Sequence, residues 1–372
     1  MDFLVTPYEV RGKVDYDRLM EEFGTSELTV ELASKLEKKC GKTHFLSRRI
    51  FYSHRDLDKV LSAWEEGKEF YLYTGRGPSG PVHLGHLMPW IFTKYLQECF
   101  EVKLIFQMTD DEKFLYSEGM NLEEAKKWAY ENSLDVIALG FDPKRTEIIM
   151  DTEHISLLYE IAIKVAKKIN FSLVKAVFGF DSSTNVGLIF FTSLQAAPAF
   201  LESERRGEKI PCLIPCAIDQ DPHFRIARDV APKLGYPKPS LILSKFFPSL
   251  SGANKMSSSS PEGSIYVTDS EEEVARKIRN AFTGGQATIK EQREKGGNPE
   301  ICSVFQYYFY LFEEKDSKLM ERMKSCKSGE LLCGECKSEL IERVLSFLRD
   351  HREKREKARD LMQEFVPEEF RD

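Results

Sequence analysis

Short apolar runs and stretches with helical spacing alternate along the middle of the chain. Continuous apolar runs predict strands, and apolar residues that recur every three or four positions predict amphipathic helices. The expected strands cover residues 70–74, 102–108, 147–150, 212–218 and 241–243. The expected helices cover residues 84–100, 122–139, 155–169, 188–201 and 222–234. This alternation is typical of an α/β fold with a doubly wound, mostly parallel sheet, which binds its ligands at the carboxyl ends of the strands.

The segments on either side of this region have a different pattern. Residues 1–45 contain one clear helical stretch, 27–39, and we interpret them as an N-terminal appendage. After residue 269 only helical spacing is found, with glycine-rich interruptions near residues 284 and 296. The predicted organisation is therefore an appendage (1–45), an α/β domain (46–269) and a second, all-helical domain (270–372).

Composition places the chain among ordinary globular proteins. Of its 372 residues, 42% are hydrophobic and 30% charged, and the net charge is −7. That charge argues against a protein that coats nucleic acid indiscriminately, although it leaves room for a shaped RNA site. No apolar run approaches the roughly 20 residues that a membrane span needs, and the first residues lack the pattern of a signal peptide. We therefore expect a cytoplasmic protein that does not enter a membrane.

The eight cysteines do not form an obvious framework. Those in apolar runs are expected to be reduced core residues; they are Cys99, Cys212, Cys216 and Cys302. Cys333 and Cys336 form a C-x-x-C pair, and Cys326 precedes them by seven residues. A zinc site needs four ligands, and only His351 offers itself as a fourth nearby. The sequence therefore predicts no metal site.

The segment 75–86, GRGPSGPVHLGH, carries the first chemical signal. It matches neither the P-loop pattern nor a regular dinucleotide-binding turn, because prolines interrupt its glycines. Its two histidines, His83 and His86, are three residues apart at the start of an expected helix, so they share one face of it. Backbone N–H groups at a helix start favour phosphate, and Gly85 lets a flat group approach the backbone. The alternative is a pair of capping or core histidines.

His83-Leu84-Gly85-His86 resembles the HIGH motif of class I aminoacyl-tRNA synthetases, and residues 255–259, KMSSS, resemble their KMSKS loop. The chain is most similar to the tryptophanyl-tRNA synthetases of the eukaryotic and archaeal type, through YLYTGRGPSG, QMTDDEK, QAAPAF and PCAIDQDPHFRIARDVAPKLGYPKP. The resemblance implies a Rossmann-type catalytic domain, a helical anticodon-binding domain and a homodimer. It also implies a tryptophan–tRNA ligase whose partners are ATP, Mg²⁺, L-tryptophan and tRNA(Trp).

The implied reaction joins the tryptophan carboxylate to the α-phosphate of ATP and expels pyrophosphate. The carboxylate is already a nucleophile, so the protein has to align the reactants and stabilise negative charge. We add Lys113 as a candidate catalytic residue, and the resemblance implies that His83, His86 and Lys255 are the others. It places Arg76, Gly77, His83, Gly85, His86, Gln220, Lys255, Met256 and Ser257 around ATP.

One position departs from the general class I motif. Ser258 stands where the loop usually has a second lysine. The resemblance implies that close relatives also carry a small residue there. Something else must then offset the phosphate charge, and Lys113 is the candidate. The alternative is that Lys113 is an ordinary surface lysine.

The resemblance also implies a tryptophan site. Tyr73 and Gln107 end two expected strands, and we expect them to accept the indole N–H. Glu112, Gln195 and Gln220 match residues around the substrate ammonium and carboxylate. Asp110 and Asp111 receive no role, because such residues often cap a following helix.

Three alternatives stay open. A tyrosyl-tRNA synthetase shares the fold and both motifs, but ordinarily has a carboxylate near the phenol, where this chain has Gln107. A nucleotidyltransferase of the same superfamily would be shorter and would lack the helical tail. A non-catalytic tRNA-binding relative would be expected to have lost Lys255 or one of the histidines. The residues that read the anticodon are not identified, because the basic segment 352–359 is interleaved with glutamates.

Overall fold

The computed structural model describes residues 3–371, apart from residues 8–9, 13 and 258–259. Its centre is a seven-stranded sheet with the order β3-β4-β9-β8-β5-β6-β7. The strands are β3 (Ser26–Glu27), β4 (Phe51–Arg55), β5 (Tyr71–Arg76), β6 (Leu104–Met108), β7 (Thr146–Met150), β8 (Cys212–Ala217) and β9 (Ser240–Ser244). The five strands from β9 to β7 are parallel, as predicted, whereas β3 and β4 are antiparallel additions at one edge.

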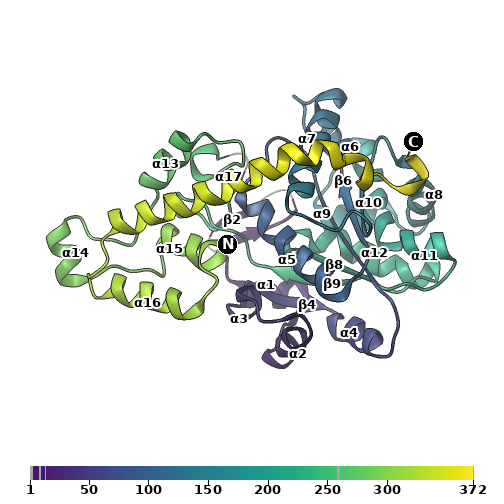
Figure 1. Ribbon diagram of the computed structural model, residues 1–372. Helices are drawn as coiled ribbons and strands as arrows, with labels where there is room; N and C mark the ends of the chain where they lie inside the picture. Colours follow the sequence, from purple (N-terminus) through teal and green to yellow (C-terminus); the bar gives the residue numbers. More distant parts are fainter. Residues whose placement is uncertain (1–2, 8–9, 13, 258–259, 372) are drawn as a thin grey trace.

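The helices lie on both faces of this sheet (Figure 1). Those of the N-terminal and α/β parts are α1 (Tyr16–Phe23), α2 (Val30–Cys40), α3 (His44–Ser47), α4 (Leu57–Glu65), α5 (Leu84–Phe100), α6 (Asp110–Tyr116), α7 (Leu122–Ala138), α8 (Ile155–Ala166), α9 (Phe171–Phe178), α10 (Val186–Leu194), α11 (Leu201–Arg206) and α12 (Asp221–Leu234). Alternate residues of β5 enter different cores, because successive side chains of a strand point to opposite faces. Leu72 belongs to one core cluster, and Tyr71 and Tyr73 belong to the other. The doubly wound α/β fold is confirmed.

Strand order fixes where a ligand can bind. The chain runs outward from β5 to β6 and β7, then returns to the other side of β5 as β8 and β9. The direction of winding therefore reverses between β5 and β8, and the crevice outside their carboxyl ends is the usual ligand site of such sheets. Helix α5 begins at this crevice, directly after the glycine-rich turn.

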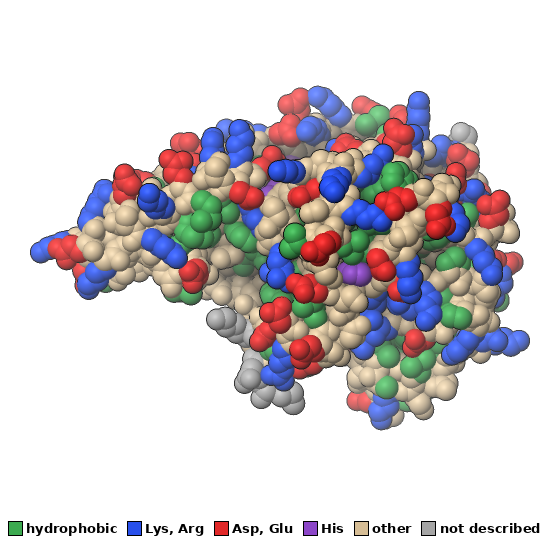
Figure 2. Space-filling model, turned by 90° about the horizontal axis from the view of Figure 1, so that it is seen from below, with side chains coloured by type: hydrophobic (Ala, Val, Ile, Leu, Met, Phe, Trp, Pro, Cys, Tyr) green, Lys and Arg blue, Asp and Glu red, His purple; other side chains and the backbone are tan. Residues whose placement is uncertain are grey.

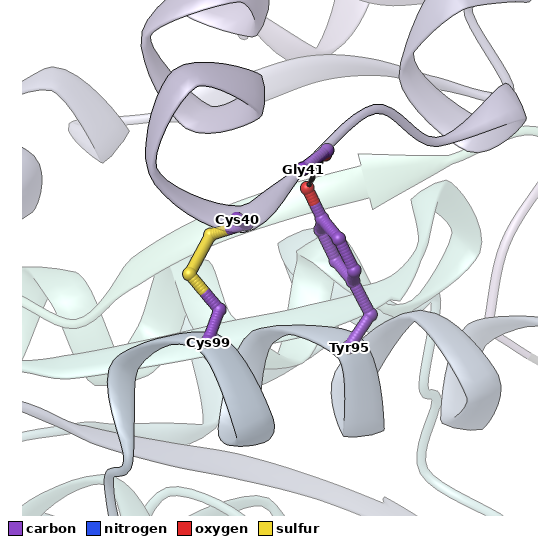
Figure 3. Close-up of a disulfide and its surroundings, with 4 residues drawn as sticks. All are labelled: Cys40, Gly41, Tyr95 and Cys99. Atoms are coloured by element: carbon purple, nitrogen blue, oxygen red, sulfur yellow. Dashed lines mark hydrogen bonds between the residues drawn. A yellow bond between two sulfur atoms is a disulfide. The ribbon is translucent and has the colours of Figure 1, made fainter.

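A disulfide joins the N-terminal region to the α/β core (Figure 3). It links Cys40, the last residue of α2, to Cys99 in α5. Next to it, the Tyr95 hydroxyl donates to the Gly41 carbonyl at 2.7 Å. The expectation of a reduced Cys99 is therefore wrong: packing of α2 on α5 brings together two cysteines that are 59 residues apart in the sequence. The other three cysteines of apolar runs are free and buried, as expected.

The stretch 188–201, predicted as one helix, is interrupted. Helix α10 ends at Leu194, a 3-10 turn follows over Ala197–Phe200, and α11 begins at Leu201. Pro198 lies in that turn, where the missing N–H of proline prevents a continuous helix. The whole segment Val186–Arg206 has the length and mean hydropathy of a membrane span, but 72% of its apolar window is buried inside the protein. It is therefore a core element of the fold.

The C-terminal region is helical and projects to one side of the α/β part (Figure 1). Its helices are α13 (Glu271–Arg279), α14 (Ile289–Lys295), α15 (Ser303–Tyr307), α16 (Asp316–Lys327) and α17 (Cys333–Phe365). Helix α17 has 33 residues, begins at the far end of the projection and returns to pack along α7. The all-helical C-terminal region is thus confirmed.

A separate antiparallel pair, β1 (Phe3–Val5) and β2 (Val10–Gly12), lies near the N-terminus. From there the chain runs through α1 into β3, which pairs with β4 at the edge of the main sheet.

Candidate active site

The glycines of the turn after β5 are required by their close neighbours. A Cβ atom on Gly75 would lie 2.6 Å from the carbonyl oxygen of Gln107 on β6. A Cβ atom on Gly77 would collide with the Lys113 side chain and lie 2.7 Å from a Glu112 oxygen. The turn therefore passes directly beneath α6, and residues larger than glycine would push the two apart.

The two histidines of the turn lie together at the start of α5. Their rings are stacked, with centroids 3.5 Å apart, and His86 Nδ1 accepts a hydrogen bond from the His83 backbone N–H at 3.2 Å. Burial, reinforced by the positive charge of Arg76, lowers the pKa of both histidines well below the usual value. Both imidazoles are thus neutral at physiological pH, and each has one N–H to donate.

The KMSSS loop contacts this turn. The Cβ atom of Met256 would lie 3.4 Å from a Cβ on Gly85, and the Leu84 N–H donates to the Ile265 carbonyl at 3.1 Å. The Lys255 ammonium pairs with Asp219 at 2.5 Å, a buried carboxylate in the 3-10 turn Ile218–Gln220 that leads into α12. The loop lysine, the HLGH turn and the start of α12 therefore meet at one place.

Lys113 and Arg76 approach the glycine-rich turn from different sides. The Lys113 ammonium lies over Gly77 and pairs with Glu112 at 3.0 Å. Arg76 is buried; its guanidinium donates to Asn132 on α7 and to the Gly80 carbonyl. Burial lowers the pKa of Arg76 to about 10. Lys113 is thus on the open side of the turn, whereas Arg76 holds the turn from within the protein.

Several positively charged side chains lie close enough to His86 to affect its pKa. After burial, the causes that lower the pKa of His86 include the charges of Arg76, Lys255 and Lys113. Cations from β5, α6 and the KMSSS loop thus create a positive potential where α5 begins, and the exposed N–H groups of a helix start add to it. The arrangement can bind an anion with several negative oxygens, such as a polyphosphate.

A hydrogen-bonded network closes the opposite end of the crevice. The Tyr73 hydroxyl donates to Gln107 Oε1 at 2.5 Å and accepts from Gln195 Nε2 at 2.6 Å. The same Gln195 nitrogen lies 3.2 Å from Gln107 Oε1. Tyr73, in the middle of β5, and Gln107, near the carboxyl end of the neighbouring β6, are both fully buried. Their oxygens face a common point, where an N–H group of a ligand can replace the Gln195 amide as donor.

Two carboxylates that support these residues were missed from the sequence. Asp151 accepts both hydrogen bonds of the Gln107 amide nitrogen, at 2.8 and 2.9 Å, and Asp219 holds Lys255. Burial, with the charge of neighbouring Asp111, raises the pKa of Asp151, and burial raises the pKa of Asp111 itself to about 7. Asp151 could have been identified from the sequence, because it directly follows a predicted strand and so lies at the ligand-binding edge of the sheet.

The remaining predicted positions lie around the same crevice. Gln220 ends the 3-10 turn before α12, and the Ser257 carbonyl accepts from Ser264 Oγ at 2.9 Å. Glu112 accepts from Thr109 Oγ1 at 3.1 Å, near the turn. Ser258 lies outside the described residues.

Comparisons with known proteins agree with this geometry. The family described as tRNA synthetases class I (W and Y) matches residues 65–349. The tryptophan–tRNA ligase of Pyrobaculum aerophilum is 55% identical over 365 residues, covering 98% of this chain and 97% of the relative. The chain belongs to the tryptophanyl-tRNA synthetase family. The ligase of Pyrococcus furiosus, also 55% identical over 98% of this chain and 94% of its own length, supports the same assignment.

Solved structures of other family members share the fold. The tryptophanyl-tRNA synthetase of Plasmodium falciparum superposes with a TM-score of 0.88 at 40% identity, covering 95% of this chain and 98% of that one. The enzyme of Giardia lamblia gives a TM-score of 0.89 at 35% identity, covering 96% and 97%. The similarity to this synthetase therefore extends over the α/β part and the helical projection alike.

Proposed function

We propose that the crevice at the carboxyl ends of β5, β6 and β8 carries out both steps of tryptophanylation. The chain is an aminoacyl-tRNA ligase of the tryptophan type. It activates L-tryptophan with ATP and transfers the aminoacyl group to tRNA(Trp). The observation that carries the site assignment is the buried Gln195–Tyr73–Gln107 network, which lies in the same crevice as the HLGH turn. It supports an indole site at one end and a polyphosphate site at the other.

In the first step, a carboxylate oxygen of tryptophan attacks the α-phosphorus of ATP. The bond between this phosphorus and the bridging oxygen breaks, and pyrophosphate leaves with the electron pair. His83 and His86, as neutral imidazoles, are placed to donate N–H hydrogen bonds to the phosphates. Lys255 has to exchange its Asp219 partner for the leaving pyrophosphate, and that exchange suits a group that acts mainly in the transition state.

In the second step, a ribose hydroxyl of the terminal adenosine of tRNA(Trp) attacks the carbonyl carbon of the adenylate. The new ester forms, the acyl–phosphate bond breaks, and AMP leaves. The proton of the attacking hydroxyl can pass to the departing phosphate. The chain's contribution to this step is again alignment, because both reactants are held in one crevice.

Mg²⁺ is proposed to enter with ATP. Among the described parts of the chain, no group of three or more His, Cys, Asp or Glu side chains is placed to hold a metal ion. The site residues therefore do not fit a dedicated ion cage. Magnesium commonly takes its ligands from substrate phosphates and water.

The same proposal assigns the remaining site residues. The cationic Lys113, over Gly77, is placed to offset phosphate charge in the absence of a second loop lysine. Glu112, Gln195 and Gln220 are proposed to hold the ammonium and carboxylate of tryptophan. Tyr73 and Gln107 would accept the indole N–H.

The division into an appendage (1–45), a catalytic domain (46–269) and an anticodon-binding domain (270–372) is part of the proposal. The helical projection is offered as the surface that reads the anticodon. Blue and red side chains are interspersed over the projection on the face shown in Figure 2, so recognition there would rely on shape and base contacts more than on a basic field.

A homodimer in the cytoplasm completes the proposal. Helix α8 exposes an apolar stripe in which Ile155, Tyr159 and Ile163 are 37%, 52% and 44% accessible. Residues four apart share one helix face, and an exposed apolar stripe of this kind suits a second copy of the chain. Tyr159→Asp should shift the molar mass in solution from dimer to monomer.

ATP–pyrophosphate exchange with each of the twenty amino acids tests the activity. Tryptophan alone should drive exchange of labelled pyrophosphate into ATP at a high rate, and in a second assay tRNA(Trp) should accept labelled tryptophan. Exchange driven by tyrosine would instead show that the chain is a tyrosyl-tRNA synthetase. No exchange with any amino acid, despite a folded chain, would reject the proposal.

A further inference from the structure

Four of the six free cysteines lie around one cavity in the helical projection. Cys302 immediately precedes α15, Cys326 lies in the last turn of α16, and Cys333 and Cys336 lie in the first turn of α17. All four line a small cavity of about 20 Å³, together with apolar neighbours such as Phe305 and Leu331. In Figure 1 this place is the outer part of the projection, where α14, α15, α16 and the start of α17 come together.

The fold supplies a ligand that the sequence did not suggest. His351, the fourth ligand considered from the sequence, is bound elsewhere, because its Nε2 lies 3.0 Å from Asp135 on α7. Cys302 is the fourth candidate ligand instead. It lies in a loop, 24 positions before Cys326 in the sequence. A C-x-x-C pair with two further cysteines is a common ligand set for zinc and for iron–sulfur clusters.

The charges around the cavity suit thiolates. Burial raises the pKa of Cys326, and it raises that of Cys336 to about 11, so the bare thiols are neutral. Arg322 Nη1 lies 3.5 Å from the Cys336 sulfur, and the ammonium of Lys337 is close enough to interact with Cys333. The start of the long helix α17 adds a partial positive charge at Cys333 and Cys336. A bound cation would add the charge needed to ionise the thiols.

An independent observation points to a sulfur-centred ligand site. Gln292 is only 3% exposed, and its side-chain nitrogen has no hydrogen-bond partner. That nitrogen and the Cys326 sulfur both lie 2.9 Å from the position of a Cβ on Gly297, so both border the same space beside this glycine. A Cβ on Gly285 would collide with the Cys333 sulfur. Donors and bare backbone packed against cysteine sulfurs are typical surroundings of metal-bound thiolates.

We propose that Cys302, Cys326, Cys333 and Cys336 bind one thiophilic metal centre, a zinc ion or an iron–sulfur cluster. Among the described residues, no three His, Cys, Asp or Glu side chains are placed to hold a single metal ion. Metal binding therefore requires the four thiols to rotate toward the cavity. A cluster keeps its cysteines farther apart than one zinc ion does and would need less rotation. Either centre would tie the ends of α16 and α17 to the loops at residues 280–302 and so fix the outer end of the projection.

The full-length chain, purified without oxygen and without chelators, provides the test. Metal analysis and acid-labile sulfide determination should give either one zinc per chain with no sulfide, or iron and sulfide in equal amounts with broad visible absorption. Cys333→Ser/Cys336→Ser should lose the metal, whereas the matched control Cys40→Ser/Cys99→Ser, which also removes two cysteines, should retain it. Tryptophan-dependent pyrophosphate exchange checks that each variant is folded.

The wild-type measurement decides the matter even if the cysteine variant does not fold. The proposal is overturned if the purified chain carries no stoichiometric metal and takes up none when reduced protein is supplied with Zn²⁺, or with Fe²⁺ and sulfide. It is also overturned if a folded Cys333→Ser/Cys336→Ser variant keeps its metal. Mass mapping that finds a disulfide among the four cysteines in the anaerobic chain would equally exclude it.

Discussion

Asp151 fixes which end of the Gln107 amide faces Tyr73 and the proposed indole site. Its two carboxylate oxygens accept the Gln107 nitrogen at 2.8 and 2.9 Å, so Gln107 presents its oxygen to Tyr73. An asparagine at position 151 has its own N–H₂ group and can pair with the amide in either orientation. We therefore expect Asp151→Asn to let the Gln107 amide flip and present a donor to the indole N–H, which is also a donor.

The structure sets the size of this effect. A buried hydrogen-bonding group that is left without its partner costs about 1–3 kcal/mol, and both Asp151 and Gln107 are fully buried. Since about 1.4 kcal/mol corresponds to a tenfold change, loss of the Gln107 orientation should raise the KM for tryptophan by about 10- to 100-fold. The KM for ATP should change little, because the proposed phosphate site is formed by the HLGH turn and the lysines near it, and not by Gln107.

The assay is pyrophosphate exchange with tryptophan and with its analogue in which sulfur replaces the indole N–H. The wild type should strongly prefer tryptophan, because its buried acceptors are left unpaired by the analogue. Asp151→Asn should reduce that preference. Asp110→Asn is the matched control: this buried carboxylate at the same edge bonds Thr152 instead of Gln107. If Asp151→Asn keeps both the wild-type KM and the preference, Gln107 is oriented by something else.

Three further outcomes are expected. Lys255→Ala should slow activation by about 10²-fold or more, roughly 2.7 kcal/mol, with tryptophan affinity unchanged in equilibrium titration; equal losses of rate and affinity would indicate a structural lysine. Burial, together with the charges of Asp110 and Glu112, raises the pKa of Asp111 to about 7, so the folded chain holds a proton that the unfolded chain releases near pH 4. The free energy of unfolding should therefore fall as the pH rises from about 4 to about 7, and Asp111→Asn should flatten this slope in urea titrations; an unchanged slope would contradict the assignment. Cys40→Ser/Cys99→Ser opens a loop with a sequence separation of 59 residues and should lower the free energy of unfolding by about 4 kcal/mol, matching wild type treated with reductant. Equal stability of the oxidised wild type and the double variant would show that the disulfide does not form in solution.

The fold was predictable where one element carries its own signal. The five parallel strands are buried on both faces and read as continuous apolar runs, so each was found close to its observed position. Strand β4, FYSHR, was missed because it is short, ends in polar residues and depends on pairing with β9, almost 200 positions later. The Cys40–Cys99 disulfide was also missed, because only the packing of α2 on α5 brings these two distant cysteines together.

Motifs identified the site, but not the partners of its residues. The KMSSS loop could be located from sequence, whereas the pairing of Lys255 with Asp219 depends on how β8 and the loop meet in space. Likewise, Gln107 could be nominated from the strand end it occupies, but the carboxylate that orients it comes from β7 and the turn after it. Roles in catalysis therefore remain proposals that mutation has to test, although the crevice brings these residues together.

Helix α17 connects the helical projection to the glycine-rich turn through hydrogen bonds with α7. Asp135 on α7 is buried and accepts from Arg355 Nε at 2.8 Å and pairs with His351 at 3.0 Å. Three residues earlier on the same face of α7, Asn132 accepts from the Arg76 guanidinium and donates to the Gly80 carbonyl at 3.1 Å. A displacement of α17 would therefore act on α7, and through it on the turn that carries the histidines.

The same helix also contacts the segment that follows the KMSSS loop. Arg352 Nε donates to the Val267 carbonyl at 3.0 Å, and the Val267 N–H donates to the carbonyl of Val82, next to His83. At its opposite end, α17 carries Cys333 and Cys336 in its first turn, so a helix of 33 residues, about 50 Å long, joins the proposed metal centre to α7 and to the segment that follows the KMSSS loop. A rigid helix of this kind transmits displacement along its axis. Whatever fixes the outer end of the projection therefore also restrains the position of α17 against the HLGH turn, and the two ends of the molecule should not be treated as independent.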